Sequence, residues 1–560
     1  MDTKNVIAAI SLSAAVIILY SLFFAPPPPD PKQIQAEKNK TTETSSADAP
    51  SLDQNEENIK ISRDEALREE QRILFENDNI KGSISLTGGL IDDLTFKKYT
   101  NTLNGNDNVV LLNPKKSENG YYVETGWATT NKNIDTPNAK SIWRVDGNNK
   151  LTPNSPIKLI WSNDQSIIFE KKISIDNQYL FTINQTIINN SEKKYNFYPY
   201  GQIIRNEIPE ITNFFILHEG PLGVFNSELV EKDYDDIQEK SFSISADKGW
   251  LGITDKYWIT SLIPQENRNF RSDFDYKNKF RANFIETNAT EIRANETKSN
   301  EIKILIAAKE VRVIDEYSKK LNIEKLDLVI DWGYLYFLTR PMWFALDYFY
   351  KLLGNYGLAI IAVTVCIRVV LFPLAQISFK SMSRMKLLAP EMQRIKEVNK
   401  DDKKKIQQEM MALYKKEKVN PMSGCLPILP MIFVFFALYK VLFVTLDGRH
   451  KPFYGYLVDL SERDPTSVFN LFGLINWAPP DFLLIGCLPI VFGISMYAQQ
   501  KLNPAPPDPI QAKIFMFFPL FLTVILAPFP SGLLLYWVTN NILQMIQQYI
   551  VMRKTKVKTT

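Results

Sequence analysis

The sequence predicts a two-part protein: a bundle of six transmembrane helices and a large all-β sandwich domain outside the membrane. Long apolar runs are confined to residues 1–24 and 356–551, although the mean hydropathy of the 560-residue chain is −0.16. Short stretches that alternate apolar and polar residues fill positions 61–323. Positive charge collects in the short loops between apolar runs, as it does on the cytoplasmic side of membrane proteins.

The first apolar run, residues 5–24, contains no charged residue and is long enough to cross a bilayer as a helix. A cleaved signal peptide needs small residues at positions −3 and −1 of the cut. Ala25 is the late small residue here, with Phe23 two positions before it and Pro26 directly after. We therefore predict that residues 1–24 are an uncleaved transmembrane anchor.

Residues 25–60 lack the apolar side chains that a folded core needs. They begin with PPPPDP and continue in charged and small polar residues, with Ile34, Leu52 and Ile59 as the large apolar side chains. Such a segment cannot bury enough surface to order itself, so we predict a disordered linker.

Residues 61–325 carry short alternating runs separated by turn residues. Ile84 and Leu86 alternate with serine and threonine, and Gly88-Gly89 offers a turn before the next run. This alternation predicts antiparallel strands with one buried face, and hence a large β-sandwich. The region contains no cysteine for disulfides, but about 260 residues suffice for a core. Other strand-like runs are SIIFEKKISI, QYLFTINQTII, KGWLGITDKYWIT and NEIKILIAA.

Residues 326–355 carry four Tyr, two Trp and three Phe among several charges. They are too charged to span a membrane, and the dense aromatic residues predict an amphipathic helix at the membrane interface.

Five further apolar segments follow. The stretch 468–480 is also apolar, but it is short and ends in two prolines, so we interpret it as re-entrant or interfacial. The first span lies within 356–379, and residues 421–551 hold the other four with their loops. The predicted spans are 356–374, 425–445, 481–500, 514–529 and 531–551.

The short loops set the orientation. Residues 380–418 hold twelve Lys and Arg against six Asp and Glu, the tail 552–560 adds +4, and residues 501–513 add +1. With six spans all three lie on one side, which the positive-inside rule makes cytoplasmic. Both termini are then cytoplasmic and the β domain is periplasmic, in the inner membrane of a bacterium with two membranes.

Arg368 interrupts an otherwise uncharged span. Thr364 lies one helical turn before it on the same face, and the other spans contain no Asp or Glu to pair with it. Asp481 lies at the mouth of one span, and Lys440 is the other clear intramembrane charge. An arginine without a carboxylate partner indicates a water-filled cavity, although a structural role in the bundle is the plainer alternative.

The last span supports a cavity. Tyr536, Asn540, Gln544 and Gln547 recur at helical spacing and form a polar stripe down one face. Such stripes also serve as interhelical contacts. Together with the unpaired arginine, the stripe favours a hydrated groove.

Residues 380–420 predict a cytoplasmic hairpin of two amphipathic helices around an NKDD turn. Methionine-rich seams suit adaptable contacts. The hairpin either rests on anionic lipid headgroups or contacts a ribosome or an emerging chain. The seam consists of Met385, Leu388, Met392, Ile395, Ile406, Met410 and Leu413.

The motifs of common enzymes do not occur. The sequence has no Gly-Lys dipeptide for a Walker A loop, no GxSxG, and two distant histidines, His218 and His450, that cannot form HExxH. We predict no enzyme activity, no cofactor and no metal site, and no nucleic-acid site is evident.

Several stretches resemble the YidC family of membrane protein insertases, in the long form of bacteria with an outer membrane. The resemblance covers the whole chain in order. It implies a five-helix insertase core with a hydrophilic groove open to cytoplasm and lipid, plus the anchor. The stretches are DWGYLYFLTRP, VTVCIRVVLFPL, KDDKKKIQQEMMALYKKEKVNPMSGCLP, FPSGLLLYWVTNNILQMIQQ, GSISLTGGLIDDLTF and GWLGITDKYW.

The resemblance also implies site residues. Relatives can carry glutamine at the position of Met431 and two tyrosines where this chain has Tyr536-Trp537, which bears on substrate preference. The implied groove residues are Arg368, its neighbour Thr364, Tyr536, Trp537 and Asn540 on the last span, and Met431, Ile432, Phe433 and Phe435 on the third.

The implied function is a membrane protein insertase and chaperone that works without nucleotide hydrolysis. Arg368 would attract the acidic flank of a client while the apolar segment passes into lipid. Nascent inner-membrane proteins and the bilayer are the implied partners, with the Sec translocon, the ribosome and the signal recognition particle as further candidates.

Two other classes stay open. A transporter or lipid scramblase using the same groove predicts internal repeats. A membrane-tethered sugar-active enzyme predicts paired carboxylates in a β-domain cleft.

Overall fold

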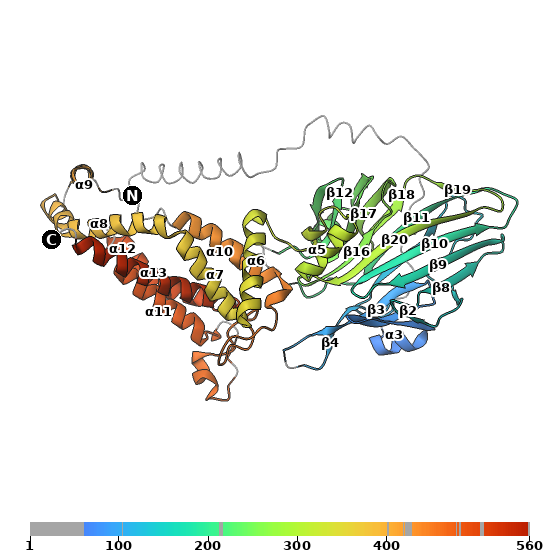
Figure 1. The fold of residues 1–560 in the computed structure, drawn as a ribbon, viewed down its shortest axis with the longest axis horizontal. Coiled ribbons are helices and arrows are strands. Elements are labelled where there is room, and N and C mark those ends of the chain that lie inside the picture. The colour runs from blue at the N-terminus through green and yellow to red at the C-terminus, as the bar shows by residue number, and fades with distance from the viewer. Residues whose placement is uncertain are drawn as a thin grey trace. The chain divides into compact units, whose positions relative to one another are not determined.

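The computed structural model in Figure 1 describes residues 61–103, 105–211, 217–399, 402–417, 428–477, 483–503 and 509–557, with 419, 479 and 480. All of them belong to one compact unit, Asp48–Thr560. The predicted anchor and linker lie outside the described residues.

The first part of this unit is the predicted all-β domain, built from two large sheets. The first sheet has eleven strands, with β4 and β19 beside a path ordered β14-β17-β18-β11-β5-β3-β2-β1-β7. Its members are β1 (Arg72–Glu76), β2 (Ile80–Ser85), β3 (Leu90–Thr100), β4 (Asn108–Leu112), β5 (Tyr121–Ala128), β7 (Lys150–Leu151), β11 (Tyr195–Arg205), β14 (Phe242–Ala246), β17 (Phe270–Tyr276), β18 (Phe280–Glu286) and β19 (Thr290–Ile292).

The second sheet has nine strands in the order β13-β12-β15-β16-β20-β10-β9-β8-β6. Every pairing in the two sheets is antiparallel except β1 with β7, so the predicted antiparallel character is confirmed. Its members are β6 (Arg144–Val145), β8 (Ile157–Ser162), β9 (Ile167–Ile175), β10 (Leu180–Asn189), β12 (Gly220–Phe225), β13 (Glu228–Glu231), β15 (Gly249–Thr254), β16 (Trp258–Ile263) and β20 (Thr297–Ala308).

The two sheets share one core. The rings of Phe75 on β1 and Phe181 on β10 meet edge-on at 5.2 Å, and Phe169 on β9 meets Phe197 on β11 at 5.7 Å. Each contact joins one sheet to the other, and all four side chains are buried. On β9 and β10 burial alternates residue by residue, as expected for strands with one face in a sandwich core.

Lys171 on β9 places a charge inside this core. It is 2 % exposed, and its Nζ donates a 2.6 Å hydrogen bond to the carbonyl of Thr125 on β5 while lying 4.8 Å from the centre of the Trp143 ring. Its register partner on β10, Gln185, is also buried. Burial lowers the pKa of Lys171 to about 8, with Glu124 acting in the opposite direction.

Replacing Lys171 with methionine is expected to stabilise the β domain by up to about 3 kcal/mol below pH 8. The folded lysine loses its proton near pH 8 and the unfolded one near 10.4. Its charge therefore destabilises the fold fully below pH 8, and this effect fades as the pH rises to about 10.4. Denaturant unfolding followed by tryptophan fluorescence at pH 7, 8.5 and 10 measures the difference. A wild-type-to-variant difference that stays constant with pH would contradict the prediction.

Four short helical elements accompany the sheets, and α6 (Tyr336–Leu353) follows them. The interfacial segment predicted over 326–355 is not one helix, because Gly333 at φ 67° precedes α6 and separates it from the first turn. One side of α6 buries Trp343 and Leu346, while Phe337, Phe344, Tyr348 and Leu352 are exposed. The short elements are α3 (Arg63–Glu69), α4 (Tyr234–Glu239), α5 (Val311–Lys320) and η1 (Leu326–Val329).

The remaining chain is helical. Helices occupy five of the six segments predicted as spans; the sixth segment, residues 5–24, lies outside the described residues. Elements of this part are α7 (Tyr356–Val370), α8 (Phe372–Val398), α9 (Lys403–Lys416), α10 (Ile428–Val444), η3 (Leu446–Gly448), η4 (Val468–Gly473), α11 (Cys487–Leu502), α12 (Pro509–Leu526) and α13 (Ser531–Val557).

The chain bends by 66° between α7 and α8. Pro373, at the start of α8, has no amide hydrogen to continue the bonding pattern of α7, so the first helix ends at Val370. By length and composition this bent pair could span a membrane, whereas no single helix within the described ranges passes the same test. Helix α13 packs against α7, α8, α10 and α11 and forms the centre of this part.

Lys440, predicted as an intramembrane charge, has an acidic partner. Its Nζ lies 2.7 Å from a carboxylate oxygen of Asp331, which precedes α6. The pairing joins the end of α10 to the segment that leads out of the β domain. Of the two charges predicted within the spans, Arg368 on α7 is the one to consider as a functional group.

Candidate functional site around Arg368

Helix α7 carries Arg368 on its buried face. Asn355 caps the helix by accepting a 3.1 Å hydrogen bond from the Leu358 amide, and Arg368 lies in the last turn, where the helix dipole favours a cation. Val369 and Val370, which follow Arg368, are exposed. The arginine therefore points into the helix bundle, with 5 % of its surface exposed.

Amide groups of α13 hold the guanidinium. The Nε of Arg368 donates to Asn540 Oδ1 at 2.8 Å, and Nη2 donates to the Asn540 carbonyl at 3.1 Å and to Gln544 Oε1 at 2.8 Å. Gln547 Nε2 donates to the Arg368 carbonyl at 3.3 Å. Three of the four residues in the predicted polar stripe thus contact Arg368.

The partners leave the charge of Arg368 uncompensated. Among the described residues, no carboxylate forms an ion pair with it, and Nη1 makes no hydrogen bond. The Gln547 Oε1 atom is buried and has no hydrogen-bond partner within the described ranges. A buried acceptor of this kind is most simply satisfied by water.

The other two predicted neighbours of Arg368 are buried. Thr364 donates its hydroxyl to the Ile360 carbonyl at 2.6 Å, so this group is bonded to its own helix. Tyr536 lies one turn before Asn540 on α13 and is 1 % exposed. Both residues line the packed base of the arginine site and present little surface to a substrate.

The predicted residues of α10 fall into two groups. Ile432 and Phe433 are about half exposed, and Met431 is half-buried. Phe435 instead stacks on Trp537 of α13, with ring centres 4.6 Å apart and planes inclined by 4°. The predicted set of groove residues on α10 therefore includes two exposed apolar side chains and one aromatic side chain that packs inside the bundle.

The aromatic contact extends beyond the predicted residues. Trp537 also stacks on Phe492 of α11 at 5.1 Å, and Phe435 stacks on Tyr439 at 6.0 Å. Neither Phe492 nor Tyr439 was predicted, because an aromatic residue in an apolar span looks the same whether it faces lipid or a neighbouring helix. Helical spacing predicted that Gln544 belongs to the polar stripe, but it did not predict the direct hydrogen bond between Gln544 and Arg368.

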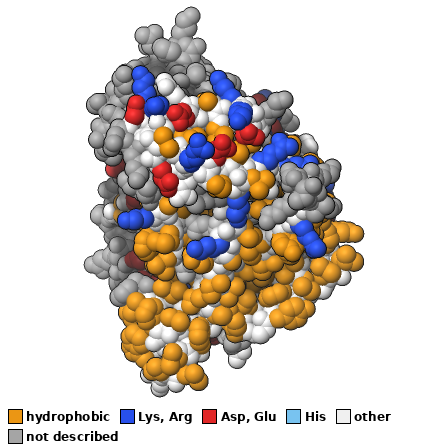
Figure 2. All heavy atoms as spheres, turned by 90° about the vertical axis from the view of Figure 1, so that its left-hand side faces the viewer, with side chains coloured by type: hydrophobic (Ala, Val, Ile, Leu, Met, Phe, Trp, Pro, Cys, Tyr) orange, Lys and Arg blue, Asp and Glu red, His pale blue; other side chains and the backbone are white. Residues whose placement is uncertain are grey.

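Helices α8 and α9 form the predicted hairpin. Met410 and Leu413 are buried, while Met385, Leu388 and Met392 are half-buried. The tip is joined by a 2.9 Å hydrogen bond from Asn399 Nδ2 to Glu409 Oε2, and the Tyr414 hydroxyl lies 4.0 Å from the Met392 sulfur. Figure 2 views the molecule from the side on which α8, α9 and α12 lie in Figure 1. One part of this face carries mixed Lys, Arg and acidic side chains, and the rest is a nearly continuous apolar surface.

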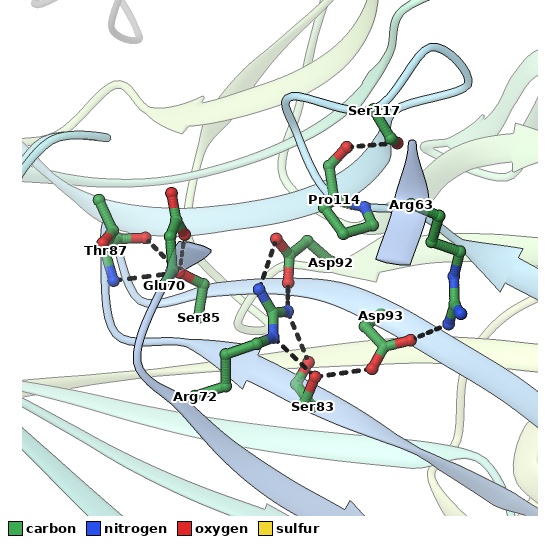
Figure 3. Close-up of polar contacts among 10 residues, drawn as sticks. All are labelled: Arg63, Glu70, Arg72, Ser83, Ser85, Thr87, Asp92, Asp93, Pro114 and Ser117. Atoms are coloured by element: carbon green, nitrogen blue, oxygen red, sulfur yellow. Dashed lines mark hydrogen bonds and ion pairs between the residues drawn. The ribbon is translucent and has the colours of Figure 1, made fainter. Parts of the chain in front are cut away.

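A separate cavity of about 560 Å³ lies in the β domain. Glu69 and Glu70, which line it, lie 2.8 and 3.7 Å from Lys116 Nζ. Asp92 on β3 is paired with Arg72 on β1, the next strand but one in the sheet (Figure 3). These carboxylates have cationic partners, so they do not form the uncommitted acid–base pair of a glycosidase.

Asp92 owes its position to a strand irregularity. On β2, Ser83 pairs with Asp93 and Ile84 pairs with Ile91, so Asp92 is an extra residue in β3. Burial raises the pKa of Asp92 to about 6, while Arg72 acts against this shift. The described residues contain no cluster of His, Cys, Asp and Glu that could hold a metal ion.

Two family models cover most of the chain. Residues 72–345 match the YidC periplasmic domain, and residues 348–559 match the 60Kd inner membrane protein. A protein of Pelagibacter ubique (strain HTCC1062) named membrane protein insertase YidC is 64% identical over 560 residues, covering 100% of both chains. The chain belongs to the YidC family of membrane protein insertases.

A second relative by sequence supports this assignment. The membrane protein insertase YidC of Brucella suis biovar 1 (strain 1330) is 40% identical over 588 residues, covering 100% of this chain and 96% of its own. A crystal structure of an active YidC insertase with the first transmembrane domain resolved aligns over 86% of this chain and 93% of its own, at a TM-score of 0.36 and 16% identity.

Family membership confirms several predictions from the sequence. The all-β region is the periplasmic domain of the family, as the loop charges indicated. The relatives are named insertases and not enzymes, in agreement with the missing catalytic motifs.

Proposed function

We propose that this chain moves segments of client membrane proteins from a hydrated, cytoplasm-facing groove beside Arg368 into the lipid bilayer, without nucleotide hydrolysis. It does so alone or together with the Sec translocon. The observation that carries the proposal is the amide setting of Arg368, which fixes a guanidinium between α7 and α13 without neutralising it.

The amide partners matter because they orient the charge and leave it available. A carboxylate partner would cancel the field of Arg368, whereas Asn540 and Gln544 supply dipoles. A client carboxylate at about 4 Å would be attracted by on the order of 4 kcal/mol at an effective dielectric constant of about 20. The orphan oxygen of Gln547 supports water beside the arginine, which lets a polar flank enter.

The apolar segment of the client follows a different surface. Ile432 and Phe433 on α10 are exposed and can contact an apolar segment as it moves toward lipid. Burying that segment in hydrocarbon releases about 25 cal/mol per Å² of apolar area, so lipid itself supplies the driving force. On the cytoplasmic side, the hairpin of α8 and α9 would meet the emerging client, and the ribosome or the signal recognition particle pathway would deliver it.

Photocrosslinking tests the path. Probes placed at Ile432 and Phe433 are expected to capture a short nascent membrane protein, and a probe at Phe517 on α12 is the matched control, since all three side chains are exposed and apolar. Capture should disappear when the apolar segment of the client is scrambled. Equal capture at all three positions would contradict the proposed path.

Replacing Asn540 with aspartate tests whether the uncompensated charge of Arg368 is needed, while the arginine itself stays in place. The new carboxylate would lie beside Arg368 Nε and neutralise it. Insertion of clients with acidic flanks is expected to fall roughly tenfold, which corresponds to about 1.4 kcal/mol. Insertion yield in proteoliposomes measures the effect, with clients that carry a neutral flank as control. An unchanged yield for acidic clients would show that the charge is not used.

A further inference from the structure

The loop between α10 and α11 exposes an unusual run of apolar side chains. In residues 468–477, here called the apolar loop, six large apolar side chains are between 42 % and 86 % exposed. No charged residue occurs from Pro465 to Pro480. The six side chains are Phe469, Leu471, Phe472, Leu474, Ile475 and Trp477.

The apolar loop is pinned at its base. The Val468 amide donates to the Ile485 carbonyl at 3.0 Å, and the Ser467 hydroxyl donates to the Leu483 carbonyl at 3.1 Å. Just outside these bonds, Asp464 accepts from the Leu488 amide at 2.7 Å, in the first turn of α11. The loop is thus fixed to the start of α11, and Figure 1 shows its short helical turn (orange) below α11.

Several backbone amides of the loop are hydrogen-bonded within the loop or to Ser467 directly before it. The Ser467 hydroxyl accepts from the Phe469 amide at 3.2 Å, and the Ser467 carbonyl accepts from the Phe472 amide at 2.8 Å. The Asn470 carbonyl accepts from the Ile475 amide at 3.0 Å, and the Ile475 carbonyl accepts from the Trp477 amide at 2.8 Å. Internal bonds of this kind are required where water is scarce, and an exposed loop in water does not need them.

Two large residues adopt strained backbone angles to expose their side chains. Leu471 and Phe472 have φ values of 51° and 59°, a region that bulky side chains rarely adopt. Both side chains are about half exposed, so contacts within the described residues compensate little of this strain. Within the described residues, both side chains therefore remain open to a further contact.

We propose that the apolar loop inserts into the lipid interface of the bilayer, at the end of the bundle where α10 ends and α11 begins. A lipid surface fits the absence of charge, because a protein partner would normally meet polar and charged groups at the rim of the contact. Trp477 lies at one end of the loop, and Tyr454 and Tyr456, exposed on the same connection, add the aromatic residues typical of membrane interfaces.

The surface also continues that of the neighbouring helix. Val491 and Ile494 of α11 are exposed apolar side chains that follow the loop in sequence, so lipid around α11 would reach the loop as well. This inference concerns anchoring to the bilayer and does not depend on the role of Arg368.

Nitroxide accessibility tests the inference on the full chain in nanodiscs of phosphatidylethanolamine and phosphatidylglycerol. Cys366, Cys425 and Cys487 are first replaced by serine, and one spin label is attached through Leu474→Cys. Collision rates with oxygen, which partitions into lipid, and with a water-soluble nickel chelate are compared. A matched control is Ile142→Cys in the β domain, which is 72 % exposed.

The oxygen-to-nickel ratio at position 474 is expected to exceed that at position 142 several-fold. Equal ratios at the two positions would place the loop in water and overturn the inference. Shielding of position 474 from both reagents would point to a protein partner and would overturn it as well. Ile475→Cys repeats the measurement on a second side chain of the loop, so a folding defect in one variant does not decide the result.

Discussion

Replacing Arg368 with alanine or glutamine is expected to reduce insertion of clients with acidic flanks by about 10- to 100-fold. A hydrogen bond to a charged group contributes about 1.5–3 kcal/mol, which corresponds to this range. Glutamine keeps a polar side chain that Asn540 and Gln544 can bond, so its failure would isolate the charge from the hydrogen bonds. Lysine restores the charge without the planar fork and should recover part of the activity.

The measurement is the insertion yield of paired clients that differ only in an acidic or neutral flank, in proteoliposomes. Thr364→Val is the matched control, because its hydroxyl is bonded to the Ile360 carbonyl of the same helix and is expected to contribute little to clients. Equal losses for acidic and neutral clients would indicate that Arg368 serves the bundle and not the client. Thermal unfolding of each variant separates this outcome from a folding defect.

Replacing Trp537 with alanine is expected to destabilise the helical part by about 3–5 kcal/mol. Its ring lies between Phe435 of α10 and Phe492 of α11, at 4.6 and 5.1 Å, so truncation opens a cavity where three helices meet. Each lost aromatic pair adds about 0.5–1.5 kcal/mol to the loss of buried area. The resemblance to the family instead assigns Trp537 to substrate contact, and the two roles predict different results.

Reversible unfolding in detergent, followed by circular dichroism, measures the loss. Trp537→Phe keeps an aromatic ring in the stack and is expected to lose about 1 kcal/mol, so it serves as the conservative control. In a double-mutant cycle with Phe435→Leu, a coupling energy of about 1 kcal/mol would confirm the direct stack. A stable Trp537→Ala variant with weakened client crosslinking would show that the ring acts on substrate.

The sequence determined the division of the chain into a β domain and a helical part, because alternating and continuous apolar patterns are local. Strands β9, β10 and β20 largely coincide with the strand-like runs of the sequence. The sequence also determined the polar stripe of the last span and the lack of a carboxylate partner for Arg368 within the spans, since both follow from residue type and helical spacing. The family resemblance rested on the same stretches.

Tertiary structure alone decided which residues meet. Gln544 and Asn540 bond Arg368 because α7 and α13 pack together, a contact between positions more than 170 residues apart. Lys440 acquired Asp331 as a partner for the same reason. Phe435 turned inward while Phe433 stayed exposed, although both are phenylalanines of one apolar helix. Sequence patterns specify a face and a period, but the neighbour on that face is set by long-range packing, which leaves no local signal.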